Sequence, residues 1–258
     1  MPAEPRPDVV SRLRAAGCVF AEDEAALLVD GAGSAAELDA LVARRVGGEP
    51  LEQVLGWAAF CGLRVLVEPG VFVPRRRTEL LALTAAAHAR AGSVVVDLCC
   101  GSGAVGLVVA GAVPGARVVA ADLDPVAIAC ARRNLGPVGG TVVGGDLFDP
   151  LPAALRGRVD VLAVNAPYVP TDAIAFLPPE ARDHEAPMAL DGGADGVDVH
   201  RRVAAGAPSW LAPGGVLLIE TGAAQAVLTA AAVTAAGLVA RVRHDEDRDA
   251  TLVTGTRT

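Results

Sequence analysis

Apolar residues near the amino terminus recur with the spacing of amphipathic helices. They fall into groups that are separated by Gly17 and by Gly31 and Gly33. The groups are Val9, Val10 and Leu13, then Ala25, Leu27 and Leu28, then Leu38, Leu41 and Val42. Residues three or four positions apart share one face of a helix, and glycine interrupts helices. The pattern predicts a small helical domain over residues 1–50.

The pattern changes to β-type alternation after Gly47-Gly48-Glu49-Pro50. Apolar and polar positions alternate over residues 58–73, which are rich in β-branched side chains. Glu68-Pro69-Gly70 lies inside this stretch and has the composition of a turn. We therefore expect a β-hairpin that turns at residues 68–70, within a linker over residues 51–76.

Apolar strands alternate with helices beyond residue 77. Thr78 is expected to cap a helix that runs to about Arg90. The strands that follow are expected at Val94–Leu98, Arg117–Ala121, Thr141–Gly144, Val159–Val164 and Val216–Ile219. Such alternation specifies a parallel sheet that is covered by helices on both faces.

Two further strands, Leu238–Arg243 and Ala250–Thr254, lie near the carboxyl terminus. The segment between them is too short for a crossover helix, so we expect them to be antiparallel. The predicted fold class is α/β, with a doubly wound, mostly parallel seven-stranded sheet over residues 77–258. Ligands of such sheets bind at the carboxyl ends of the strands, near the point where the strand order reverses.

The composition excludes disorder and disfavours nucleic acid. Hydrophobic residues make up 52% of the 258 residues and charged residues 20%, so the chain has ample material for a core. The 22 basic residues, all arginine, and the 30 acidic residues sum to a net charge of −8. Neutralising the phosphates of a duplex requires a basic face, and we therefore expect no direct contact with nucleic acid.

Neither a membrane nor a disulfide framework is expected. The longest apolar runs, such as Ala104 to Ala112, fall short of the roughly 18 residues of a bilayer span. The first residues, MPAEPRPD, lack the basic and apolar regions of a signal peptide, which predicts a cytoplasmic protein. The odd set of five cysteines has no paired C-x-x-C spacing, so no zinc or other metal site is predicted.

A glycine loop follows the first strand of the predicted sheet. In Asp97-Leu-Cys-Cys-Gly101-Ser-Gly103-Ala-Val-Gly106 the glycines match the dinucleotide pattern G-x-G-x-x-G. Asp122 ends the next strand, where a carboxylate binds a ribose diol in such folds. Both a nicotinamide dinucleotide and S-adenosylmethionine contain that ribose. Asp97 favours S-adenosylmethionine, because a carboxylate there disfavours a pyrophosphate and attracts an ammonium group.

Each acidic residue also has a purely structural interpretation. Asp97 could cap the following helix, and Asp122 could form a turn before Asp124-Pro125. Asp146, beside Leu147, could bind the amine and face of adenine or simply form a turn. The stronger observation is that Asp97, Asp122, Asp146 and Asn165 end successive strands, so they should converge on one crevice.

The segment Asn165-Ala166-Pro167-Tyr168 lies at the same edge and contains the only tyrosine of the chain. The Asn165 side-chain oxygen and the Ala166 carbonyl could each accept a hydrogen bond from one NH2 group, while Tyr168 covers its planar face. A plain turn is the alternative interpretation. In the functional interpretation, the segment binds an acceptor that is an amide or an amine.

These segments together resemble the class I methyltransferases that modify a planar nitrogen group, and more narrowly the protein-(glutamine-N5) methyltransferases that act on peptide chain release factors. The resemblance extends over nearly the whole chain. It is carried by residues 49–56, 70–75, 78–81, 97–106, 145–149, 165–168 and 189–196.

The resemblance implies transfer of a methyl group from S-adenosylmethionine to the amide nitrogen of a glutamine, in the Gly-Gly-Gln loop of a release factor. It implies that Cys99, Cys100, Gly101, Ser102 and Gly103 wrap the methionine part of the cofactor. Asp122 would hold the ribose, Asp146 and Leu147 would flank adenine, and Asn165, Ala166, Pro167 and Tyr168 would grip the glutamine. The helical domain would recognise the substrate, and a monomer is expected.

The chain departs from the family pattern in three places. Ala166 replaces the first proline of the tetrapeptide, Cys99 replaces the first glycine of the loop, and Arg76-Arg77 replaces Pro-Asp. Because of these changes, an alternative is methyl transfer to a different acceptor, which would be another protein glutamine or a small amide or amine. A non-catalytic paralogue that binds S-adenosylmethionine and a nicotinamide oxidoreductase are further alternatives.

Two downstream segments have both a functional and a structural interpretation. His184 could reach the site or lie at the surface. Residues 191–196 resemble a calcium loop only loosely and are better explained as a loop that leads into a helix.

Overall fold

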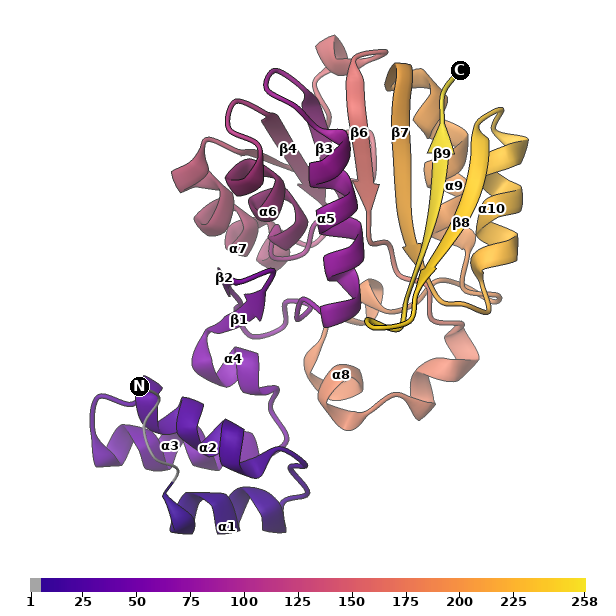
Figure 1. Cartoon of the computed structure of the whole chain (residues 1–258). Helices are drawn as coiled ribbons and strands as arrows, with labels where there is room; N and C mark the ends of the chain where they lie inside the picture. The colour runs from indigo at the N-terminus through magenta and orange to yellow at the C-terminus, as the bar shows by residue number, and fades with distance from the viewer. Residues whose placement is uncertain (1–5) are drawn as a thin grey trace.

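The computed structural model describes residues 6–258 (Figure 1). The prediction that the chain has no signal peptide rests partly on residues 1–5, which lie outside the described residues. Within residues 6–258 no helix combines the length and the apolar composition needed to cross a bilayer.

The amino-terminal part is helical, as the spacing predicts. It contains α1 (Pro7–Ala15), α2 (Ala21–Gly31), α3 (Ala35–Val46) and the short α4 (Leu51–Leu55). The Ser34 side chain accepts a hydrogen bond from the Glu37 N–H at 3.2 Å and so starts α3. Leu13, Leu28 and Val42 are fully buried in a core of their own, which also includes Val54 of α4. The predicted boundaries of the helical domain, the linker and the sheet domain, at residues 50 and 76, stay a prediction.

A two-stranded hairpin follows, but its turn is not where the sequence predicts it. β1 (Trp57–Phe60) pairs antiparallel with β2 (Leu63–Leu66), and the turn is formed by Cys61 and Gly62. Both have left-handed φ angles, 48° and 75°, as type I′ hairpin turns require. The prediction that the hairpin turns at Glu68-Pro69-Gly70 is wrong, because a left-handed Cys61 has no signal in the sequence. A turn does form at residues 68–71, where the Val71 N–H donates to the Glu68 carbonyl at 3.0 Å. Residues 68–70 lie beyond the hairpin.

The remaining chain forms the predicted sheet, with strand order β5-β4-β3-β6-β7-β9-β8. β9 pairs antiparallel with β7 and β8, and the other pairs are parallel. The predicted fold class is confirmed. The strands are β3 (Val94–Leu98), β4 (Arg117–Asp122), β5 (Thr141–Gly144), β6 (Val159–Val164), β7 (Leu211–Thr221), β8 (Val239–Asp245) and β9 (Ala250–Thr256).

Helices cover both faces of this sheet. Alternate strand residues point to opposite faces, so Val95 joins one core cluster and Val96 the other. The first cluster includes side chains of α5 (Glu79–His88), α6 (Ala104–Ala112) and α7 (Pro125–Leu135). The second includes side chains of α9 (Asp198–Gly206) and α10 (Ala226–Ala235).

The strand order reverses between β3 and β6, so the loops after these strands diverge and open a crevice at their carboxyl ends. Figure 1 shows α8 (Pro179–His184) beyond these ends, between the sheet and the amino-terminal helices. Thr78 occupies the position before α5, but its side chain makes no capping hydrogen bond, so the predicted cap is wrong. Its hydroxyl faces the site instead.

Candidate active site

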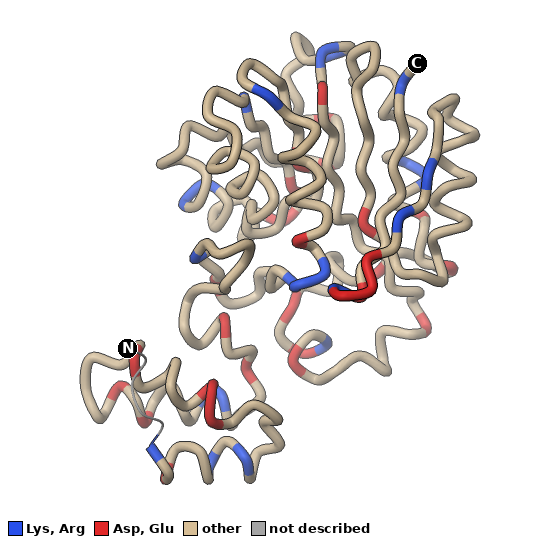
Figure 2. The backbone as a smooth tube through the Cα atoms, viewed as in Figure 1, with Lys and Arg blue, Asp and Glu red and all other residues tan. Residues whose placement is uncertain are grey.

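A cavity of about 630 Å³ lies at the carboxyl ends of the parallel strands. This size is typical of pockets for small molecules and cofactors. Asp97, Asp122, Asp146 and Asn165 all line it, so the structure brings together the strand-end residues that the sequence singled out. Figure 2 shows that the middles of the inner strands carry almost no charge, whereas acidic residues gather toward this end of the sheet.

The glycine loop needs its glycines for backbone shape and close packing. Gly101 and Gly103 have left-handed φ angles of 54° and 78°. A Cβ on Gly106 would lie 3.0 Å from Val118 Cγ1 and 3.3 Å from Asp97 Oδ2. The loop therefore turns sharply after β3, and α6 packs closely against the sheet.

The adjacent cysteines have no evident role as nucleophiles. Cys99 has a φ of 54°, a strained conformation for a residue other than glycine. Both Cys99 and Cys100 line the cavity, and burial raises the pKa of each thiol well above its usual value. Thiols that stay protonated are poor nucleophiles.

The Asp97 carboxylate makes a structural contact with the following helix and also reaches the cavity. The residue is 1% exposed, and its Oδ2 accepts a hydrogen bond from the Gly106 N–H in α6 at 2.9 Å. It also lines the cavity. Burial raises the pKa of Asp97 to about 7, and the nearby Asp122 contributes in the same direction. A cation in the cavity would favour the charged form of this carboxylate.

The Asp122 carboxylate is held in place by backbone groups. Its Oδ2 accepts from the Gly101 N–H at 2.8 Å and its Oδ1 from the Asp124 N–H at 2.9 Å. The turn interpretation is therefore correct, yet the carboxylate also lines the cavity. Burial raises the pKa of Asp122. A fixed carboxylate beside the glycine loop suits a ribose diol.

Asp146 is less available to bind a ligand than the sequence suggests. Its Oδ2 pairs with an Arg202 guanidinium nitrogen at 2.6 Å, and both residues line the cavity. Leu147, the next residue, has a left-handed φ of 47° and also lines the cavity. An amine of a ligand would have to share Asp146 with Arg202, whereas Leu147 remains suited to packing on a planar ring.

The segment 165–168 forms another part of the cavity wall. Ala166 is 1% exposed, and the Asn165 Nδ2 lies 3.4 Å from the Thr78 hydroxyl. The Tyr168 hydroxyl donates to Glu220 Oε1 at 3.3 Å. These contacts fix the tetrapeptide between α5 and β7.

Residues 191–196 pack closely against the backbone of Tyr168 in the tetrapeptide. A Cβ on Gly192 would lie 2.8 Å from the Tyr168 Cα, and one on Gly196 would lie 2.4 Å from the Tyr168 carbonyl oxygen. The segment leads into α9, and Asp191 accepts from the Gly193 N–H at 2.9 Å. The structural interpretation of this loop is confirmed, since its glycines allow the close approach.

Two buried polar residues near the tetrapeptide were missed from the sequence. Glu220 is 2% exposed and lies next to the last residue of the apolar strand β7, which is the signal that could have revealed it. His200 is fully buried on α9, and burial lowers its pKa to about 4, although the Ala166 carbonyl acts in the opposite direction. Its Nδ1 lies 2.9 Å from the Thr229 hydroxyl, and nothing in the sequence distinguishes it.

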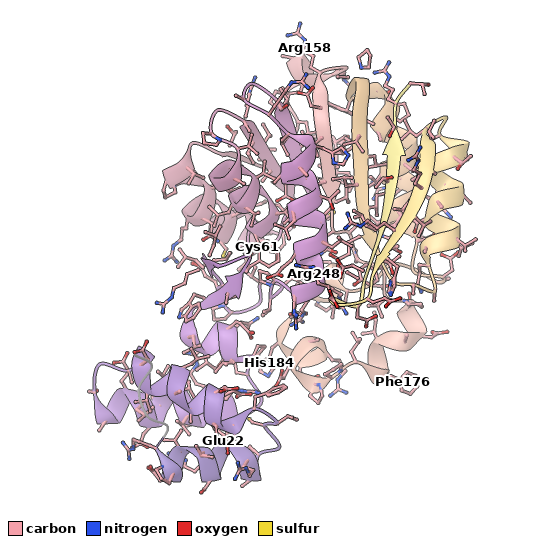
Figure 3. The ribbon with its side chains drawn as sticks, viewed as in Figure 1. Glu22, Cys61, Arg158, Phe176, His184 and Arg248 are labelled. Carbon is pink, nitrogen blue, oxygen red and sulfur yellow. The ribbon has the colours of Figure 1, made fainter. Side chains whose placement is uncertain are left out.

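His184 does not line the cavity. Figure 3 shows it on α8, on the side of the amino-terminal helices. A Cβ on Gly48 would lie 3.9 Å from its Nε2. The structural interpretation of His184 therefore holds.

The chain was compared with known proteins. Residues 62–176 match the methyltransferase small domain family. The chain is also similar to many individual proteins, of which three illustrate the range. The release factor glutamine methyltransferase of Geobacter sulfurreducens is 42% identical over 72% of this chain and 65% of its own length. That of Mycolicibacterium smegmatis is 39% identical over 86% of this chain and 80% of its own length. A 4-amino-L-phenylalanine/4-methylamino-L-phenylalanine methyltransferase of Streptomyces pristinaespiralis is 39% identical over 76% of this chain and 69% of its own length.

Solved structures support the fold. A methyltransferase from Pyrococcus furiosus aligns with a TM-score of 0.58 and 17% identity, over 77% of this chain and 91% of its own. At that identity the similarity concerns the fold alone.

Proposed function

Because the chain belongs to the release factor glutamine methyltransferase family, we propose that it transfers a methyl group from S-adenosylmethionine to the side-chain amide nitrogen (N5) of a glutamine in a protein. The proposed acceptor is the Gly-Gly-Gln loop of a peptide chain release factor. The observation that carries this proposal is the cavity itself, which joins the glycine loop to Asn165, Ala166 and Tyr168.

The cavity residues fit S-adenosylmethionine, the methyl donor of this family. Asp97 supplies a negative charge beside the glycine loop, as an ammonium group requires, and would discourage a pyrophosphate. Asp122 would hold the ribose hydroxyls. Leu147 and Asp146 would contact adenine, and residues 99–103 would wrap the methionine part.

The acceptor end of the cavity fits a planar amide. The Asn165 side-chain oxygen and the Ala166 carbonyl would each accept one N–H of the glutamine NH2 group, and Tyr168 would cover its face. An amide nitrogen is a poor nucleophile, because its lone pair is delocalised into the carbonyl. Two acceptors that hold both N–H groups favour the development of charge on nitrogen.

The bound cofactor would supply an electrophilic methyl group on a positively charged sulfur. The chain's own contribution would be orientation, because the residues at the two ends of the cavity would hold the amide nitrogen and the methyl group close to each other. Thiol chemistry plays no part, since Cys99 and Cys100 stay protonated.

An amine acceptor is the second candidate, and two observations favour it. The relative from Streptomyces pristinaespiralis is named for a free amino acid that carries an aromatic amine. In this chain, Arg76 and Arg77 line the cavity where the family pattern has Pro-Asp. Guanidinium groups at this place could bind the carboxylate of a free amino acid.

Formation of S-adenosylhomocysteine distinguishes the two candidates. The full chain would be incubated with S-adenosylmethionine and either an intact release factor or 4-amino-L-phenylalanine. The proposed function predicts product only with the release factor, and Asn165→Ala should abolish it. Product only with the amino acid would establish the second candidate, and none with either would leave the proposed function without support.

The proposed partner is the release factor, which acts during translation, and we therefore propose that the enzyme acts in the cytoplasm. We propose that it works as a monomer and touches neither nucleic acid nor membrane directly. The amino-terminal helices would contact the release factor outside its Gly-Gly-Gln loop.

A further inference from the structure

One wall of the cavity is formed by a segment that has few contacts with the rest of the chain. Around the start of α8 the cavity is lined by Leu177, Pro178 and Glu180. None of residues 172–180 is buried, so apolar packing does little to hold this segment. Among the hydrogen bonds and ion pairs of residues 6–258, only the ion pair between Glu180 and Arg45 of α3 joins the segment to a distant element.

Arg45 binds one carboxylate of the helical domain and one of the cavity wall at the same time. The residue is 8% exposed. Its Nε and Nη2 donate to the two carboxylate oxygens of Glu24 in α2, at 2.6 and 3.2 Å. This bidentate contact leaves Nη1, which lies 2.6 Å from Glu180 Oε1 and donates to the Glu49 carbonyl at 3.2 Å. A single guanidinium therefore connects α2 and α3 to α8.

The helical domain fixes the position of this contact. A guanidinium is rigid and planar, so the bidentate pair with Glu24 determines where Nη1 of Arg45 points. The side chain of Arg45 is 8% exposed, whereas that of Glu180 is 48% exposed. The buried partner is held by its surroundings and the half-exposed one is not. It is therefore the start of α8 that takes its place from Arg45.

The carboxyl end of α8 is held by the linker, without Arg45. Gln53 Nε2 donates to the His184 carbonyl at 3.4 Å. Just beyond the helix, Glu185 Oε1 accepts the Val73 N–H at 3.1 Å. Loss of the pair between Arg45 and Glu180 should therefore release the start of α8 and the residues before it, while the far end of the helix stays attached.

We propose that Arg45 is a positioning residue for methyl transfer, which holds the cavity wall of residues 177–181 in place through Glu180. A wall that stays in place keeps the two reactants oriented inside the cavity. The amino-terminal helices then do more than contact the release factor, because they also complete the cavity in which the reaction occurs. The inference deepens the proposed function and rests on it for the identity of the reaction.

The contact can be removed from either side. Glu180→Ala deletes the carboxylate, whereas Glu180→Gln keeps an oxygen that can accept from Arg45. Arg45→Lys leaves a cation beside Glu24, but one ammonium nitrogen cannot replace the three nitrogens of the guanidinium. Asp183→Ala is the matched control, because Asp183 lies on the same helix, pairs with the adjacent Arg182 and does not line the cavity.

Hydrogen exchange reads the wall directly, in the full chain with S-adenosylmethionine and without any acceptor. The N–H groups of Leu177, Ala181 and Arg182 donate to backbone carbonyls, so their exchange reports local opening. They should exchange about tenfold faster or more in Glu180→Ala and Arg45→Lys, less so in Glu180→Gln, and at the wild-type rate in Asp183→Ala. Unchanged exchange of β3 reports that each variant has folded. Wild-type exchange of these three groups in Glu180→Ala would overturn the proposal.

Kinetics with an intact release factor provide the second readout. Glu180→Ala and Arg45→Lys should each lower kcat on the order of 10-fold, because the reactants lose orientation, while Asp183→Ala keeps the wild-type value. The double variant should lose no more than the worse of the two single variants, since both changes remove one contact. Losses that multiply would mean that Glu180 acts by itself on the ligand, and would overturn the proposal.

The two readouts separate this inference from the proposed function. A wild type that is inactive on release factors would refute the proposed function. The exchange rates of the wall would still decide whether Arg45 holds it, because they are measured without an acceptor.

Discussion

The buried carboxylate of Asp97 accepts a hydrogen bond from the Gly106 N–H at 2.9 Å, which joins the end of β3 to the first turn of α6. The same carboxylate lines the cavity proposed to bind S-adenosylmethionine. One group thus anchors the glycine loop and is proposed to provide a negative charge for the ligand. Because burial raises the pKa of Asp97 to about 7, the proposed attraction of the ligand's ammonium group depends on pH.

Affinity for S-adenosylmethionine should rise with pH up to about 7 and then level off. Only ionised Asp97 attracts the ammonium group, and below its pKa of about 7 the carboxyl must first lose a proton. Each pH unit below that value should weaken binding by up to about tenfold. Calorimetric titrations from pH 5.5 to 8.5 measure the effect, with Asp97→Asn as the control that should bind weakly and lose this dependence. Equal wild-type affinity at pH 6 and pH 8 would contradict the assignment.

Asp97→Asn should stabilise the protein in the absence of cofactor. The folded pKa of about 7 exceeds the unfolded value of about 3.9, so the folded state retains a proton that the unfolded state releases. This group's contribution to the free energy of unfolding therefore falls as pH rises from about 4 to 7. Asparagine still accepts from Gly106 and carries no charge.

The expected gain is about 2 to 4 kcal/mol at pH 8 and close to zero at pH 4. Urea unfolding of both proteins at the two pH values measures it. A variant less stable than the wild type at pH 8 would show that burial of the Asp97 charge is not a cost.

Gly196→Ala should damage methyl transfer through the backbone of Tyr168. Its Cβ would lie 2.4 Å from the Tyr168 carbonyl oxygen, so the tetrapeptide would have to move. We expect kcat to fall on the order of 100-fold with little change in cofactor affinity, because a displacement of about 1 Å can cost that much.

Gly214→Ala is the matched control for this variant. Gly214 has a φ of 76°, similar to the 79° of Gly196, but a Cβ there would meet nothing within 4 Å. It should lose comparable stability from backbone strain and keep its activity. If the two variants have equal kcat, the loop does not position Tyr168.

Ala166→Pro should raise stability and preserve transfer to glutamine. Pro167 already biases Ala166 toward the extended backbone that proline adopts, so the substitution adds little strain. It reduces the entropy of the unfolded chain and should add about 0.4 to 1 kcal/mol to the free energy of unfolding. Thermal unfolding and steady-state rates measure both effects. A large loss of activity would indicate that the Ala166 N–H or a looser backbone is needed, and would favour a different acceptor.

The sequence predicts the sheet and the strand-end residues well, because these depend on local patterns. The strands from Val94–Leu98 to Val159–Val164 were expected within one residue of their observed ends. Asp97, Asp122, Asp146 and Asn165 were expected to converge because parallel strands end at one edge.

Tertiary contacts explain the features that the sequence does not predict. The hairpin turns at Cys61, which has a left-handed backbone and whose N–H donates to Glu79 Oε1 at 3.0 Å. The hydroxyl of Thr78 lies 3.4 Å from Asn165 Nδ2 and does not cap its own helix.

Mass spectrometry of an intact release factor tests the central claim most directly. The factor would be incubated with the full chain and S-adenosylmethionine carrying a deuterated methyl group, and its peptides would be sequenced. We expect one labelled methyl group on the glutamine of the Gly-Gly-Gln loop, and none when Asn165→Ala replaces the wild type. An unlabelled loop, with cofactor binding demonstrated in the same preparation, would contradict it.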